Sequence, residues 1–160
     1  MSIQAGEKMP SGTFGVMTES GPGAMSTDDL FADKKVVIFS VPGAFTPTCS
    51  MNHLPGFIDH AEKIIAKGVN TIACMAVNDV FVMDAWGRDR GVGEHVTMLA
   101  DGNGEYAKAL GLDFDASAFG MGTRGQRFAL IVDNGIVLHV AVEKAGQFEV
   151  SSAESILENL

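Results

Sequence analysis

Cysteine is scarce in this chain of 160 residues, which contains only Cys49 and Cys74. Two cysteines are too few for a disulfide framework, and a chain of this length buries enough surface to fold without one. The sequence has no C-x-x-C pair, which excludes a dithiol oxidoreductase built on that motif. We therefore expect two free thiols in a reducing compartment, which indicates a cytoplasmic protein.

The chain also has few positively charged residues. The sequence has 11 lysines and arginines against 20 aspartates and glutamates, which gives a formal net charge of -9. Its basic residues form no cluster beyond short pairs such as Lys34-Lys35. A nucleic-acid-binding protein needs a basic surface, so this class is excluded.

Long apolar segments are missing as well. The longest, residues 36–45, is interrupted by Ser40, Pro42 and Gly43 and is too short to span a membrane. The first residues lack a basic stretch followed by an apolar one, so no secretory signal is expected. With 46% hydrophobic and 19% charged residues the composition is globular, and we predict one domain over residues 1–160 without membrane contact.

Apolar segments alternate with helical patterns along the chain. Residues 35–41 and 70–77 are apolar runs without polar alternation, which is typical of strands buried on both faces. Asn134-Gly135 is a type I′ turn signal between two further strands. The expected elements are a hairpin in the first 25 residues, a short helix from Ser26 to near Lys34, strands at 35–41, 70–77, 96–100, 127–133 and 136–142, helices at 49–67 (kinked at Pro55), 79–88 and 104–110, and a terminal helix opened by a capping box at Ser151–Glu154.

This order of elements predicts an α/β protein. A strand-helix-strand unit is followed by further strands, an antiparallel pair and a last helix. Such a chain forms a mixed central sheet flanked by helices. The arrangement resembles the thioredoxin-like fold with insertions.

Three apparent motifs fail on inspection. Residues 120–125 match the G-x-G-x-x-G pattern of dinucleotide sites, but a strand follows them where that site requires a helix. Residues 101–105 open like a calcium-binding loop, but Tyr106 and Leu112 stand where that loop requires glycine and glutamate. The four histidines show no metal-ligand spacing. We therefore expect no nucleotide, no metal and no other resident cofactor.

Cys49 lies where a loop leads into a helix. Unpaired backbone N–H groups and the positive end of the helix dipole favour a thiolate there, and the thiolate is the reactive form of cysteine. Thr46 is placed to bring a hydroxyl beside the sulfur, while Pro42 and Pro47 stiffen the loop. Burial as a small apolar residue is the alternative for Cys49. For Cys74, in the middle of an apolar strand, an inert buried thiol is the favoured interpretation.

The segment around Cys49 also resembles a known family. Residues 42–50, PGAFTPTCS, followed by HLPGF at residues 53–57, resemble the active-site segment of the type II peroxiredoxins, the peroxiredoxin-five group. The P-x-x-x-T-x-x-C core is highly specific for peroxiredoxins. The resemblance covers essentially the whole chain in order. It continues through Val77-Asn78-Asp79, Ala85-Trp86-Gly87-Arg88, Leu99-Ala100-Asp101 and Arg127-Phe128.

The resemblance implies a role for each matching residue. Cys49 matches the peroxidatic cysteine, which attacks a hydroperoxide and becomes a sulfenic acid. Thr46 matches the threonine whose hydroxyl binds the peroxide oxygens, and Pro42 matches the proline that shields the site. Arg127 matches the arginine that steadies the thiolate and the O–O bond. Arg124 is close in sequence and ranks second for that role.

The resemblance further implies a thioredoxin-like fold, reduction of hydrogen peroxide and organic hydroperoxides, and homodimers formed through the face near the site. Phe45, Trp86 and Phe119 would lie around the site or that interface, or else serve as ordinary core aromatics. Animal members carry a third cysteine near the C-terminus, but residues 148–153 contain none. In this respect the chain resembles plant and bacterial members, which implies glutathione with or without glutaredoxin as the reductant.

Two other classes of function stay open at this point. One is a Cys–His hydrolase or acyltransferase with His53 or His139 as the base, which would act on an ester or thioester. The other is a redox sensor or holdase that uses Cys49 as a switch and reacts only slowly with peroxide.

Overall fold

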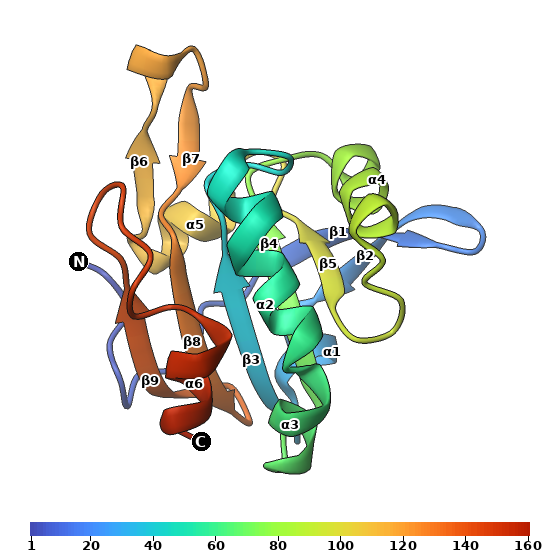
Figure 1. Ribbon diagram of the computed structural model, residues 1–160, viewed down its shortest axis with the longest axis vertical. Coiled ribbons are helices and arrows are strands. Elements are labelled where there is room, and N and C mark those ends of the chain that lie inside the picture. Colours follow the sequence, from blue (N-terminus) through green and yellow to red (C-terminus); the bar gives the residue numbers. More distant parts are fainter.

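A seven-stranded mixed sheet forms the middle layer of the computed structural model, which describes residues 1–160 (Figure 1). In the order in which they pair, its strands are β2 (Gly21–Ser26), β1 (Thr13–Thr18), β5 (Thr97–Ala100), β4 (Thr71–Ala76), β3 (Lys35–Ser40), β8 (Phe128–Asp133) and β9 (Ile136–Val142). The three central strands β5, β4 and β3 are parallel, and the outer strands pair antiparallel. The predicted mixed sheet is confirmed.

Helices cover both faces of this sheet (Figure 1). They are α1 (Thr27–Phe31), α2 (Leu54–Asp59), α3 (Ala61–Ala66), α4 (Val80–Arg90), α5 (Glu105–Leu110) and α6 (Ala153–Glu158). The buried side chains of α2, α3, α4 and α6 belong to one apolar cluster, and those of α1 and α5 belong to a second. The predicted α/β architecture, a thioredoxin-like fold, is therefore confirmed. None of these helices is both long enough and apolar enough to cross a membrane.

The central strands show why their sequence lacks polar alternation. Along β3, Val37 and Phe39 enter the first cluster, while Val36 and Ile38 enter the second. Successive side chains of a strand point to opposite faces, so a strand covered on both faces needs apolar residues at every position. The loop after β3 begins where this run ends, and it leads to Cys49.

Several local predictions are confirmed. The first hairpin, β1 with β2, lies at one edge of the sheet. Ser26 caps α1 in a full capping box with Asp29. Asn134 and Gly135 have φ angles of 48° and 81°, the left-handed pair that a type I′ turn between β8 and β9 requires.

The helix predicted over residues 49–67 is not one kinked helix. It consists of a π-helical turn, η1 (Cys49–His53), followed by α2 and α3, with a break at His60. In η1 the backbone N–H of Leu54 donates to the carbonyl of Cys49. Pro55 has no N–H and its ring would clash with the carbonyl four residues earlier, so a wider turn in front of it relieves the conflict.

One further prediction needs correction, and one feature was not predicted. Ser152, not Ser151, caps α6, because its hydroxyl accepts from the N–H of Ser155 at 3.2 Å. The sequence also gave no sign of a second, two-stranded sheet made of β6 (Asp113–Asp115) and β7 (Thr123–Gly125), which flank the 3-10 helix η2 (Ser117–Phe119). Strands of three residues are too short to show a periodic pattern.

Candidate active site

Cys49 stands at the start of η1, and its sulfur is fully enclosed, with 0% of the residue exposed. Two side chains donate hydrogen bonds to that sulfur. The hydroxyl Oγ1 of Thr46 lies 2.8 Å from Sγ, and Nη2 of Arg127 lies 3.0 Å from it. The structure therefore brings together three of the residues that the sequence singled out: Thr46 and Cys49, which follow β3, and Arg127, which directly precedes β8.

The loop before Cys49 fixes the hydroxyl of Thr46. Oγ1 lies 2.7 Å from the carbonyl oxygen of Gly43, in addition to its contact with Cys49. A hydroxyl has one proton, so it donates to one of these two acceptors at a time, and a negatively charged thiolate is the stronger acceptor. The carbonyl of Thr46 accepts from the N–H of Ser50 at 2.9 Å, which ties the loop to the helix.

The guanidinium of Arg127 is held from two sides. Nη2 donates to Cys49, and Nη1 donates to Nδ1 of His53 at 2.9 Å. The ring of Phe148 lies 5.9 Å from Cζ, within the range of a cation–π contact. These partners aim the positive charge at the sulfur.

His53 is the neutral acceptor for Arg127. Its Nε2 lies 2.9 Å from the carbonyl oxygen of Ser151, which can only accept, so the ring proton is on Nε2 and Nδ1 has a free lone pair. Burial, and next the charge of Arg127, lower the pKa of His53 to about 3. The ring is therefore uncharged at neutral pH.

The sequence did not identify His53 as a partner of Arg127. The sequence made it a candidate base of a hydrolase, and in the structure it is fully buried among aromatic rings. These are Phe39 at 4.8 Å, Phe148 at 4.9 Å and Phe57 at 5.6 Å between ring centroids. The available signal was spacing, because His53 is four residues after Cys49 and such pairs share one face of a helix.

Two side chains of helix α4 bind the η1 turn at Ser50. Trp86 is fully buried, and its Nε1 donates to the hydroxyl of Ser50 at 2.8 Å. Nη1 of Arg90 donates to the carbonyl of Ser50 at 3.2 Å, a contact that the sequence did not predict. The two other aromatic residues considered for this region differ, since Phe45 is 50% exposed and Phe119 is 80% exposed.

Arg124 has different partners from Arg127. It donates to the carbonyl oxygens of Met121 at 2.9 Å, Val77 at 3.2 Å and Pro42 at 3.5 Å. These bonds tie β7 to the residue after β4 and to Pro42 in the loop before Cys49. None of them goes to the sulfur, so the geometry agrees with the higher rank given to Arg127.

Cys74 lies in the middle of β4, fully buried, and it is also a free thiol. Burial, and next the neighbouring Cys49, raise the pKa of the Cys74 thiol well above its ordinary value. Its position agrees with the predicted inert thiol.

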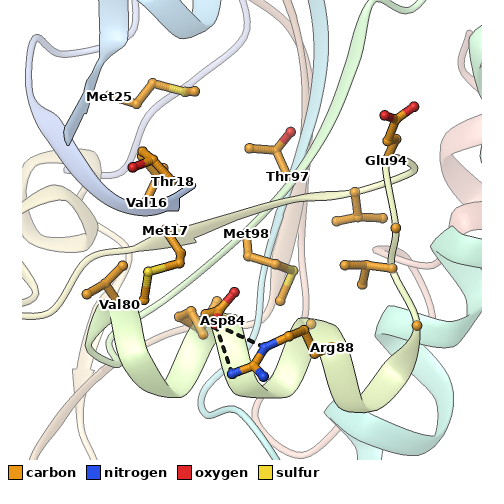
Figure 2. A pocket seen from close by; sticks show the side chains of 16 residues that line it. Val16, Met17, Thr18, Met25, Val80, Asp84, Arg88, Glu94, Thr97 and Met98 are labelled. Atoms are coloured by element: carbon orange, nitrogen blue, oxygen red, sulfur yellow. Dashed lines mark hydrogen bonds and ion pairs between the residues drawn. The ribbon is translucent and has the colours of Figure 1, made fainter. Parts of the chain in front are cut away.

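The surface also has a hollow away from this sulfur. A groove of about 650 Å³ runs between the β1–β2 hairpin, α4 and β5, with methionines on its walls and an ion pair of 3.0 Å between Arg88 and Asp84 (Figure 2). Neither Cys49 nor a residue bonded to its sulfur lines this groove. No three His, Cys, Asp or Glu side chains gather as a metal site either.

Known proteins are similar to this chain in sequence and fold. The Redoxin family model matches residues 4–157. Peroxiredoxin-2D of Arabidopsis thaliana is 48% identical over 159 residues, which cover 99% of this chain and 98% of the relative. The reduced Prx3 of Vibrio vulnificus in complex with hydrogen peroxide matches with a TM-score of 0.94 and 50% identity, over 98% of both chains. Peroxiredoxin 5 of Alvinella pompejana matches with a TM-score of 0.87 and 33% identity, over 98% of this chain and 96% of the other.

Proposed function

Because this chain belongs to the Redoxin family, as a type II peroxiredoxin, we propose that it is a thiol peroxidase in which Cys49 reduces hydroperoxides. The observation that carries the proposal is the pair of donors on the sulfur, Thr46 at 2.8 Å and Arg127 at 3.0 Å. A buried thiol without such partners is a core residue. A buried sulfur that faces a guanidinium and a hydroxyl is prepared to carry negative charge.

The first step is a displacement at oxygen. The Cys49 thiolate attacks one oxygen of ROOH, an S–O bond forms and the O–O bond breaks. The sulfur is oxidised to a sulfenic acid, and the peroxide is reduced to RO⁻, which takes up a proton and leaves as alcohol or water. No metal or cofactor takes part in this step.

Thr46 and Arg127 act on the charge that moves during this step. Negative charge begins on the sulfur and ends on the leaving oxygen, so donors that reach both positions stabilise the transition state. Arg127 has its guanidinium fixed by His53, and Thr46 has its hydroxyl between the sulfur and Gly43. Pro42, at the start of the loop, limits access of water to the sulfur in this proposal.

A hydrolase with a histidine base receives no support from the geometry. Both ring nitrogens of His53 are engaged, one with Ser151 and one with Arg127, and neither faces the sulfur. A general base needs a pKa near the working pH, whereas burial lowers that of His53 to about 3. His139 is on β9, outside the hydrogen bonds that surround Cys49.

Stopped-flow fluorescence tests the peroxidase function. Trp86 is the only tryptophan, and it is hydrogen-bonded to Ser50, the residue next to Cys49. Mixing with hydrogen peroxide should give a fast fluorescence change that Cys49→Ser abolishes. A slow change would favour a redox sensor or holdase, and ester hydrolysis without any peroxide reaction would favour a hydrolase.

We propose further that glutathione, with or without glutaredoxin, reduces the sulfenic acid. The sequence offers only Cys74 as an internal partner, and Cys74 lies within the sheet. Glutathione thiol would displace water from the sulfenic sulfur to give a mixed disulfide, which a second thiol or glutaredoxin then reduces. Since Cys49 is fully enclosed, this exchange requires the η1 turn to open.

Mass spectrometry of the oxidised protein tests this reductant. After one equivalent of peroxide and then glutathione, the expected product is a glutathione adduct on Cys49 that glutaredoxin removes. Failure to form that adduct, with turnover supported by another thiol, would contradict the proposal.

We also propose a homodimer formed near the active site. Phe45 follows β3, and Phe81 lies in the first turn of α4, which follows β4, so both lie beyond the carboxyl ends of neighbouring parallel strands. They are 50% and 62% exposed, and Met51 of η1 is 71% exposed. Large apolar side chains gathered at one end of a sheet indicate an interface. Sedimentation equilibrium should show a dimer, and a monomer at every concentration would contradict this.

A further inference from the structure

Glu143 is a buried carboxylate that the steps above do not use. It follows β9 directly and is only 7% exposed. Its Oε2 accepts from the backbone N–H groups of Glu149, Val150 and Ser151 and from the hydroxyl of Ser151, all between 2.7 and 2.9 Å. A carboxylate that gathers three consecutive N–H groups fixes the path of the segment that supplies them.

The segment that Glu143 gathers reaches the active site. It belongs to the loop between β9 and α6 (Figure 1, orange-red). The carbonyl oxygen of Ser151 accepts from Nε2 of His53 at 2.9 Å. Just before it in the same loop, Phe148 lies against both the His53 ring and the guanidinium of Arg127.

Two separate hydrogen-bonded paths connect Glu143 to Arg127. The backbone N–H of Glu143 donates to the carbonyl of Arg127 at 3.0 Å, so the two residues are neighbours where β8 and β9 meet. The second path leads from the Glu143 carboxylate through Ser151 and His53 to the Arg127 guanidinium. Both the backbone and the side chain of Arg127 are therefore held by connections that begin at Glu143.

The orientation of His53 depends on this second path. The Ser151 carbonyl selects the tautomer with the proton on Nε2, and that tautomer leaves Nδ1 as an acceptor for Arg127. With the proton on Nδ1, an N–H group would face the N–H of Arg127 and repel it. A displaced Ser151 carbonyl would thus release the arginine that points at Cys49.

We propose that Glu143 is a positioning residue for the reaction of Cys49: by holding the Ser151 carbonyl against His53, it keeps Arg127 directed at the sulfur. This inference rests on the proposed peroxidase function. Glu143 itself touches neither the sulfur nor the substrate, and it acts through Ser151, His53 and Arg127.

The charge state of Glu143 suits this role. Burial raises the pKa of its carboxyl, but the hydrogen bonds from Ser151 and from the backbone of residues 149–151 outweigh burial and hold it below the ordinary value of 4.5. At neutral pH the group is a carboxylate with only acceptor sites, which matches the donors around it.

Glu143→Gln tests the role, because the amide keeps the shape of the side chain but loses its negative charge. Its one oxygen is a weaker acceptor than a carboxylate oxygen for the four donors that meet Oε2. We expect sulfenic acid formation at Cys49 by hydrogen peroxide to slow by about tenfold, as for other small displacements of a reacting group. The pH profile of Cys49 alkylation by iodoacetamide should also move to higher pH. Glu158→Gln makes the same change at an exposed site in α6, and it should alter neither quantity.

Nitrogen NMR of His53 supplies a readout that needs no peroxide. The parent should show one tautomer with the proton on Nε2, and Glu143→Gln should show a mixture. If the parent failed to react with peroxide, the proposed function would fall, while the alkylation profile and the tautomer would still decide the role of Glu143.

Combining Glu143→Gln with His53→Asn tests whether Glu143 influences the reactivity of Cys49 through His53. The asparagine oxygen can still accept from Arg127, but the shorter side chain does not reach Ser151. In that background Glu143→Gln should change the alkylation rate by less than about twofold.

Two results would overturn the inference. One is a folded Glu143→Gln protein with the parental alkylation profile and the parental tautomer. The other is a double variant whose alkylation rate falls by the product of the two single-variant effects, since the two residues would then act independently. If His53→Asn does not fold, the tautomer in Glu143→Gln alone decides.

Discussion

Cys49 and Cys74 are both free, both completely buried and both members of the same apolar cluster. Their polar surroundings differ. Cys49 has the Thr46 hydroxyl and the Arg127 guanidinium within 3.0 Å of its sulfur. Cys74 lies between the backbones of two neighbouring strands, and burial is the largest cause that raises the pKa of its thiol.

The comparison shows that exposure is a poor guide to a reactive cysteine. Desolvation opposes the thiolate at both positions, and only oriented donors can offset it. The donors at Cys49 are Thr46, in the loop before it, and Arg127, which is 78 positions away in the chain. The fold, and not the local sequence alone, therefore distinguishes the two thiols.

The largest expected effect is that of Cys49→Ser. We expect this variant to stay folded and to lose peroxide turnover, because serine is nearly isosteric and a far weaker nucleophile. Consumption of hydrogen peroxide, measured with glutathione and glutaredoxin present, should fall below about one tenth of the parental rate. A higher rate would mean that the two cysteines have been assigned the wrong way round.

Arg127→Gln should have the next largest effect. It removes a fixed donor from the sulfur, and loss of one such donor lowers the rate of comparable reactions by about 10²-fold. Arg124→Gln is the matched control, because its guanidinium bonds to carbonyl groups and should cost less. The measurement is the second-order rate constant from Trp86 fluorescence. Equal losses in both variants would show that the contact with Cys49 is not the source of activation.

His53 sharpens the comparison because it is as buried as Cys74 and hydrogen-bonded like Cys49. Its pKa is about 3 in the folded protein against 6.5 in the unfolded chain, so the unfolded chain binds the extra proton between these values. Stability should therefore be lost as pH falls from 6.5 toward 3.

Urea unfolding at two pH values measures this loss. Between pH 7 and pH 4 the His53 contribution amounts to about 3 kcal/mol, which His53→Gln should remove from the pH dependence. Glu143 also loses its contribution in acid, but below its ordinary pKa of 4.5, so it affects only the lower end of the range. An unchanged pH dependence in His53→Gln would show that the histidine is not held neutral.

The sequence was sufficient for features that depend on nearby residues. The apolar runs of β3 and β4, the Asn134-Gly135 turn and the Ser26 cap all follow from local patterns. The placement of Thr46 three residues before Cys49, on the approach to a helix, also predicted the contact between them.

Features that depend on distant partners could not be predicted in this way. The hydrogen bonds of His53 join it to Arg127 and Ser151, which are 74 and 98 positions away in the chain. Ser151 was expected to cap α6, but Glu143 binds it and leaves the cap to Ser152. Tertiary hydrogen bonds thus override a valid local signal.

The smallest effect on turnover is expected for Cys74→Ser. A disulfide requires the two Cα atoms to come within about 7 Å and the Cβ atoms to face each other. Cys74 is fixed in β4 by pairing with β3 and β5, so only an opened η1 turn could bring Cys49 to it. We therefore expect most glutathione-dependent turnover to remain. Cys74→Ala accompanies this variant, because a serine hydroxyl in an apolar core can reduce stability by itself.

Mass spectrometry of the parent, after one equivalent of peroxide and without glutathione, gives the decisive result. An intramolecular Cys49–Cys74 disulfide would make the protein two mass units lighter than its reduced form, whereas a sulfenic acid makes it heavier by one oxygen. If the lighter species dominates and both Cys74 variants lose turnover, then Cys74 is a resolving cysteine. Its burial would then be a property of the reduced state alone, and the difference between the two thiols would lie in the order in which they react.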